Sequence, residues 1–262
     1  MNTSIASAPE TQPALVGPER SGPLGRFWHL PSVVVARFTL RSYLRSGWGW
    51  GEFVFVVVFF LVFWTYPGTE DYFFSTGSFG LGILALLGTA IMVHRAMSAR
   101  VYLPLARLTS RAACTRGLAL ASGVLRVPLY LLLLVLALAS HKIIAPQPAH
   151  ILVGSLGLLA NSILVSTLIV ALSPPIATRL IRICFLFWLV IALTPLPNVD
   201  WLAILLSVIR LPLLPVALCI GLGTSPNLSL ASFWPLAVVA LLIVGLALLA
   251  DFLLKRRDLI LH

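Results

Sequence analysis

Long apolar runs separated by short polar segments constrain this chain more than any other feature of its sequence. Six of these runs approach the roughly 20 residues that a helix needs to cross about 30 Å of hydrocarbon. They cover about 53–66, 73–97, 127–145, 151–172, 180–196 and 234–254. The sequence therefore predicts an all-α integral membrane protein with six transmembrane helices.

The composition of the chain agrees with membrane insertion. Hydrophobic residues make up 60% of the chain, charged residues only 10%, and the mean hydropathy is +1.03. A soluble domain needs a more polar surface than this. The net charge of +10 would suggest nucleic acid in a soluble protein, but here we assign it to membrane topology and expect no nucleic-acid partner. Cys114, Cys184 and Cys219 lie far apart without metal-ligand spacing, so we expect three free thiols.

The placement of basic residues predicts the orientation. Sixteen of the eighteen Lys and Arg residues fall in the N-terminal tail, the second and fourth loops and the C-terminus, whereas only Lys142 and Arg210 fall on the other side. Because basic residues concentrate on the cytoplasmic side, both termini are expected there, in a plasma membrane such as the bacterial inner membrane. Residues 1–31 are polar and proline-rich and are expected to form a disordered cytoplasmic tail, with 32–262 as one transmembrane domain.

The segment 32–47 predicts a helix that lies in the membrane interface. Arg37, Arg41 and Arg45 recur every four residues, and Ala36 and Leu40 belong to the apolar positions that cover much of the other side. Such a pattern is typical of interfacial amphipathic helices.

The apolar stretch Trp201–Leu222 lies between the fifth and sixth predicted spans and contains Arg210. A seventh crossing here would put the basic C-terminus outside, against the charge rule. We therefore expect a re-entrant or interfacial hairpin on the outer side, although hydropathy alone also allows a spanning helix. Asp200 and Arg210 are a possible outer gate; alternatively, Asp200 caps a helix and Arg210 extends to the outer surface.

The second loop, from Arg100 to Arg126, carries five arginines and no acid. At 100° per residue, three of them share one helical stripe, and Pro104 marks a favourable helix start. The pattern predicts a cytoplasmic helix that docks a partner through its arginines. The alternative is a positively charged loop that only sets topology. The expected docking residues are Arg100, Arg107, Arg111 and Arg116.

This organisation resembles the permease subunit of an ABC-2 type transporter, an exporter class whose ATPase is often a separate chain. The likeness covers about 32–262, and only the second loop is motif-like. That loop has Leu108 where the family commonly has proline. The features that carry the likeness are the basic helix before the first span, the run Tyr102–Arg107 followed by Ser110, Arg111 and Gly117, the outer hairpin, and Lys255-Arg256-Arg257-Asp258.

The resemblance implies a coupling helix between spans two and three. It also implies a permease homodimer or heterodimer in the lipid bilayer, and cytoplasmic ABC ATPase partners that bind ATP and Mg²⁺. On this chain itself we expect no cofactor, no metal and no catalytic residue, because the sequence has no P-loop and its histidines are dispersed. We therefore expect a transport subunit rather than an enzyme.

The apolar runs contain few ionisable residues. Glu52, His94, Arg95 and Asp251 are expected near the membrane interfaces, with Asp251 and Lys255 forming a pair on one helix surface.

A membrane scaffold that anchors a cytoplasmic complex without transport is an alternative function. The coupling subunit of a vitamin-type ABC importer is another, although it would be expected to have two long cytoplasmic helices. The sequence does not indicate the substrate beyond favouring hydrophobic or amphiphilic cargo.

Overall fold

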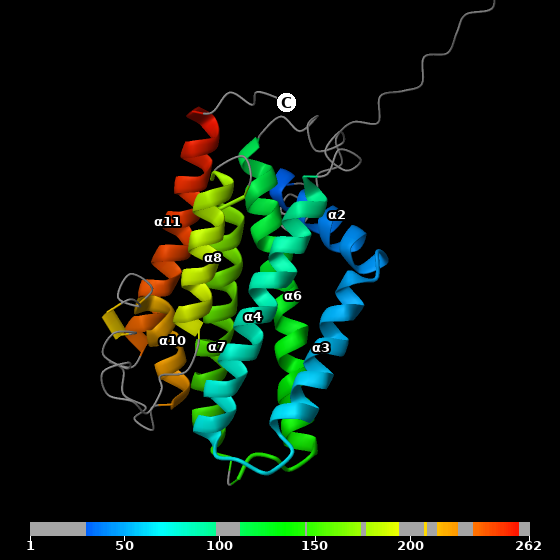
Figure 1. Cartoon of the computed structure of the whole chain (residues 1–262), viewed down its shortest axis with the longest axis vertical. Coiled ribbons are helices and arrows are strands. Elements are labelled where there is room, and N and C mark those ends of the chain that lie inside the picture. The colour runs from blue at the N-terminus through cyan, green and yellow to red at the C-terminus, as the bar shows by residue number, and fades with distance from the viewer. Residues whose placement is uncertain are drawn as a thin grey trace, which may run out of the picture.

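The computed structural model describes residues 30–97, 111–144, 146–173, 177–193, 207–208, 214–224 and 233–256. The described residues form a bundle of helices, most of which run along its long axis (Figure 1). In chain order the helices are α2 (Pro31–Arg45), α3 (Trp48–Phe63), α4 (Glu70–Ala96), α6 (Arg111–Ala139), α7 (Pro148–Ala171), α8 (Arg179–Leu193), α10 (Leu214–Thr224) and α11 (Trp234–Arg256).

The predicted spans correspond to helices, but not all of these helices are long. Within the described ranges, four helices are long and apolar enough to cross a membrane, and the bent pair α2–α3 raises the number to five if it is one broken span. The four are α4, most of α6, α7 and α11. Helix α8, which corresponds to the fifth predicted span, has only 15 residues. The described residues therefore support a multi-pass helical membrane protein with fewer full-length spans than the six expected.

A sharp bend separates the predicted interfacial helix from the first predicted span. Helices α2 and α3 meet at 69°. Gly47 forms the bend with φ = 83°, in the left-handed region where a side chain would be strained. Before it, Ser46 Oγ donates a hydrogen bond of 2.7 Å to the Tyr43 carbonyl oxygen. The bend directs α2 across α6 instead of along the bundle axis (Figure 1).

Helix α6 (Arg111–Ala139) includes both the end of the predicted second loop and most of the predicted third span. It runs for 29 residues without a break, so Arg116 and Arg126 lie within the same helix as the third predicted span. Gly117 explains how α2 comes so close, because a Cβ there would lie 2.6 Å from Val35 Cβ. Pro128 also lies inside α6, and a proline within a helix removes one backbone hydrogen bond. The second loop is therefore shorter than expected, and its last part belongs to the bundle.

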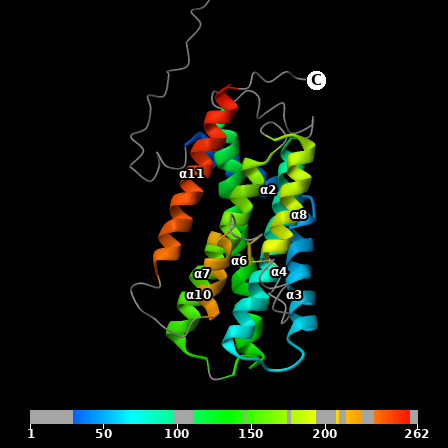
Figure 2. The ribbon, with the colours of Figure 1, turned by 60° about the vertical axis from the view of Figure 1, so that its left-hand side comes forward.

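Helix α7 lies at the centre of the bundle, with α4, α6, α10 and α11 packed around it (Figure 2). Small residues bring these helices close together: a Cβ at Gly154 would lie 2.4 Å from the Phe74 ring of α4. At Gly157 it would lie 2.7 Å from the backbone oxygen of Cys219 in α10. Close approach at small residues is the usual way in which membrane helices associate. Helix α10, the described end of the predicted outer hairpin, is thus packed on protein.

The loops at one end of the bundle are tied together. Gly68 N donates to the Lys142 carbonyl oxygen at 2.9 Å, and Ile144 N donates to the Gly68 oxygen at 3.0 Å. Lys142 Nζ donates to the Thr65 carbonyl oxygen at 2.7 Å. Gln147, just before α7, donates its backbone N–H to the Glu70 carboxylate at the start of α4, and the same carboxylate contacts Nδ1 of His150. This end, called the loop end below, lies opposite the end that holds α2, the start of α6 and the end of α11, called the α2 end (Figure 1).

Candidate functional site

The predicted docking residues lie at or beyond the edge of the described chain. Arg100 and Arg107 are outside the described residues, and only the backbone of Arg111, the first residue of α6, is described. Asp200 and Arg210 of the predicted outer gate are also outside them. The docking stripe and the gate therefore stay predictions.

Arg116 is described, and it makes an intramolecular ion pair. Its Nε lies 2.6 Å from Asp251 Oδ2 of α11, and Nη2 also contacts this oxygen. Thr115 Oγ1 lies 3.3 Å from the other carboxylate oxygen. Asp251 is only 5% exposed, which differs from the expected surface pair with Lys255. The fork of an arginine can bind a carboxylate through two N–H groups, and here it ties α6 to α11 at the α2 end.

A second ion pair is fully buried beneath the α2–α3 bend. Arg126 Nη1 of α6 lies 2.8 Å from Glu52 Oε2 of α3, and Arg126 Nη2 lies 3.3 Å from Oε1. The hydroxyl of Tyr43 in α2 donates a hydrogen bond of 2.6 Å to Glu52 Oε1. Arg126 is 1% exposed and Glu52 5%. The three residues, called the Glu52 cluster below, connect α2, α3 and α6.

Helix α4 closes the Glu52 cluster from a further side and leaves room for it. Gly88 faces the ion pair so closely that a Cβ there would lie 2.1 Å from Glu52 Oε1 and 2.8 Å from Arg126 Nη2. Any residue other than glycine would displace the carboxylate or the guanidinium. The absence of a side chain at position 88 is therefore part of the site.

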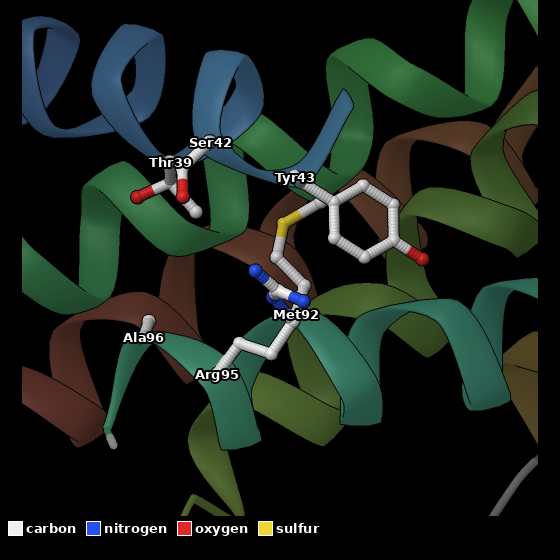
Figure 3. A pocket seen from close by; sticks show the side chains of 6 residues that line it. All are labelled: Thr39, Ser42, Tyr43, Met92, Arg95 and Ala96. Atoms are coloured by element: carbon white, nitrogen blue, oxygen red, sulfur yellow. The ribbon is translucent and has the colours of Figure 1, made fainter. Parts of the chain in front are cut away.

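A small cavity lies beside the Glu52 cluster, between α2 and α4 (Figure 3). Thr39, Ser42 and Tyr43 line it from α2, and Arg95 extends toward α2 from α4. Its volume is about 10 Å³, which is room for a group no larger than one water. This particular cavity is too small for a substrate.

Two residues of the Glu52 cluster are buried in protein, which sequence reasoning did not predict. The position of Glu52 near a membrane interface stays a prediction, whereas Arg126, which the sequence assigns to the basic loop, lies inside helix α6. A signal for burial was present: Arg126 follows the apolar segment 117–125 and precedes the apolar segment 127–139 without a break in helical sequence. Buried charges in membrane helices are costly and generally pair with each other, as Glu52 and Arg126 do.

Larger hollows lie elsewhere among the described residues. One, of about 760 Å³, is an open apolar groove between α2 and α6 with Arg37 among its lining residues. Another, of about 400 Å³, lies between α4, α7 and α8. Among the described residues there is no group of three or more His, Cys, Asp or Glu side chains that could hold a metal ion.

Comparisons with known proteins add no further constraint. No protein family, curated protein or solved structure matches this chain. The function is therefore argued from the residues and their geometry.

Proposed function

We propose that this chain is the transmembrane permease subunit of an ATP-driven ABC-2 type exporter. In this proposal two permease protomers form the substrate path, and cytoplasmic ATPase subunits on separate chains supply the energy. The sequence resemblance described above suggests the family. The observation that carries the proposal is the continuity of α6 from the basic segment into the core of the bundle.

A coupling segment must move the membrane helices when its partner moves. Helix α6 begins at Arg111, directly after the segment that holds Arg100 and Arg107, and ends at Ala139 near the loop end. A displacement at its start is therefore transmitted along one rigid element. A loop joined to the bundle by a flexible hinge would lose most of such a displacement.

Two ion pairs extend this connection to other helices. The Glu52 cluster holds α2 and α3 to α6, and the Arg116–Asp251 pair holds α11 to α6. Neither pair includes, among the described residues, a second acid that would suggest proton transfer. Their geometry supports a mechanical role, in which α2, α3, α6 and α11 respond together to an ATPase at the α2 end.

The scaffold alternative makes a different prediction. A scaffold needs a docking surface but no coupled motion of its helices, and it would not stimulate ATP hydrolysis in response to cargo. A gene for an ABC ATPase beside the gene for this chain would favour the exporter at little cost.

The decisive experiment reverses two arginines of the predicted stripe. The arginine stripe is expected to face an acidic surface of the ATPase. In Arg107→Glu with Arg111→Glu, two negative charges would face that acidic surface, and such repulsion can cost several kcal/mol of binding free energy. The double variant is therefore expected to abolish co-purification of the ATPase. Insertion should survive because fourteen of the sixteen basic residues on that side remain. The matched control is Arg37→Glu with Arg41→Glu, which makes the same charge change on exposed positions of α2.

The outcomes separate the alternatives. Loss of ATPase in the stripe variant alone supports the coupling assignment. Equal loss in both variants indicates a general charge effect, and full retention of coupled ATP hydrolysis in the stripe variant refutes the docking stripe. A stable complex whose ATPase is indifferent to cargo and to both variants would favour the scaffold.

A further inference from the structure

The cavity between α4, α7 and α8 is lined by residues with side-chain atoms that have no hydrogen-bond partner among the described residues. It has a volume of about 400 Å³ and lies where α4 and α7 end and α8 begins, at the α2 end. This volume falls within the usual range for small-molecule sites, about 300–1,000 Å³. The polar lining residues are His94, Ser173 and Arg182, and the apolar ones include Val93, Ile169 and Leu186.

Two of the polar lining residues have buried atoms without a partner among the described residues. Ser173 is 2% exposed, and its Oγ makes no hydrogen bond there. Arg182 Nε is likewise buried and unbonded. Buried polar groups in proteins are nearly always hydrogen-bonded, so Ser173 Oγ and Arg182 Nε are donors available to a ligand that supplies acceptors.

The backbone around Ser173 is held in place by hydrogen bonds. Ser173 N donates to the Val170 oxygen at 3.0 Å, and its own carbonyl oxygen accepts from Ala177 N at 3.1 Å. In α8, Arg182 N donates to the Thr178 oxygen at 3.1 Å. These backbone groups are thus satisfied, and the side chains of Ser173 and Arg182 remain available to a ligand.

The charge of the cavity selects the chemistry of that ligand. Arg182 and His94 line it, and none of its described lining residues carries a carboxylate. An arginine fork and a hydroxyl together match the oxygens of a phosphate group. The remaining walls, from Val93, Ile169 and Leu186, are apolar and match a hydrocarbon chain.

We propose that this cavity binds the phosphate head group of an acidic phospholipid, with part of an acyl chain against the apolar wall. Basic pockets between membrane helices on the cytoplasmic side commonly bind acidic lipid head groups. The proposal concerns this chain alone and does not require an ATPase or an export activity. The lipid-binding proposal can therefore be wrong while the exporter proposal is right, and the exporter proposal can be wrong while the lipid-binding proposal is right.

The test uses the full-length protein, purified in a mild detergent and freed of lipid. Thermal unfolding would be followed with added phosphatidylglycerol, with phosphatidylcholine of the same acyl chains, or with inorganic phosphate. Phosphatidylglycerol is expected to raise the unfolding temperature in a saturable way. Arg182→Gln should weaken its apparent affinity about tenfold, because a hydrogen bond to a charged group is lost. Ser173→Ala should weaken it about fivefold.

The controls distinguish a built site from general surface charge. Arg41→Gln removes the same charge from an exposed position of α2 that does not line the cavity, and it should leave the affinity unchanged. Ala90→Phe fills the apolar part of the cavity without changing charge, and it should also weaken lipid binding. If Arg182→Gln fails to fold, Arg182→Lys retains the charge and tests the fork geometry.

Three results would overturn the proposal. The first is equal stabilisation by phosphatidylcholine, which carries no net charge. The second is equal weakening by Arg41→Gln and Arg182→Gln. The third is saturation by inorganic phosphate at the same concentration as the lipid, which would assign the cavity to a soluble anion.

Discussion

Glu52 of α3 and Arg126 of α6 are 74 positions apart in the sequence and form a fully buried ion pair, with Arg126 Nη1 2.8 Å from Glu52 Oε2. The pair lies directly beneath the bend between α2 and α3, and Tyr43 of α2 donates a hydrogen bond to it. Charges this deeply buried are destabilising unless each has its partner. The position of α2 against α6 therefore depends on the integrity of this pair.

Removal of one partner of the pair should be strongly destabilising. Arg126→Met leaves the Glu52 carboxylate buried without its counter-charge, and such changes cost about 3–5 kcal/mol. Thermal unfolding in detergent is expected to shift down by several degrees. The triple variant Tyr43→Phe, Glu52→Leu, Arg126→Met replaces the whole cluster by apolar groups and should recover most of that loss. A triple variant less stable than Arg126→Met would show that the pair itself stabilises the fold.

The space at Gly88 should be as important as the charges. In Gly88→Ala the new Cβ would overlap Glu52 Oε1, at 2.1 Å, and must push the ion pair apart. We expect a loss of stability comparable to that of Arg126→Met. Gly245→Ala in α11 is the matched control, because nothing lies within 4 Å of its Cβ and alanine favours helix over glycine by about 0.5–1 kcal/mol. Equal behaviour of the two variants in thermal unfolding would contradict the packing at Gly88.

The Arg116–Asp251 pair should contribute less than the Glu52 cluster. The Arg116 side chain is 52% exposed, so water screens its charge, whereas the Asp251 side chain is 7% exposed. Arg116→Gln is expected to cost about 1–3 kcal/mol, mainly because the buried carboxylate loses its charged donor. The charge swap Arg116→Asp with Asp251→Arg tests the pairing. A double-mutant cycle with no coupling energy between positions 116 and 251 would refute the contact.

The two ends of the bundle should differ in accessibility to reagents that cannot cross a membrane. In a variant without Cys114, Cys184 and Cys219, new cysteines at Thr65 and Ser140 of the loop end should react from outside the cell. A cysteine at Arg45 of the α2 end should react only after the membrane is opened, because the basic residues favour the cytoplasm at that end. All three positions are exposed in the fold. Reaction at Arg45 in intact cells would reverse the proposed orientation.

Much of the secondary structure follows from local sequence. Apolar runs and their boundaries predicted the helices that the structure places at Pro31–Arg45, Glu70–Ala96, Pro148–Ala171 and Trp234–Arg256, each within a few residues. Such helices are predictable because their hydropathy and their terminal residues are properties of neighbouring positions. The three free cysteines were likewise predicted and are confirmed.

The limits of local reasoning are visible at Arg126. A run of arginines ahead of an apolar segment indicates a cytoplasmic loop, and Arg126 was assigned to that loop. The structure instead continues one helix through it, because α3 and α4 provide the carboxylate and the space that offset the cost of burying a guanidinium. The stability of a buried charge is set by its neighbours in space, and those neighbours are 74 positions away in the case of Glu52.

The sequence by itself thus determined that the chain is helical and apolar enough for a membrane, and where half of the described helices begin and end. The side of the membrane that carries the basic charge stays a prediction. Only the tertiary structure decided which charges meet. At Asp251 the local i, i+4 rule indicated Lys255, whose side chain is outside the described part of the chain, and it could not indicate the ion pair with Arg116, which lies 135 positions earlier. The physical reason is the same at Arg126 and at Asp251. The attraction between opposite charges is strongest where packed helices exclude water, and helix packing, not spacing along the chain, creates such places.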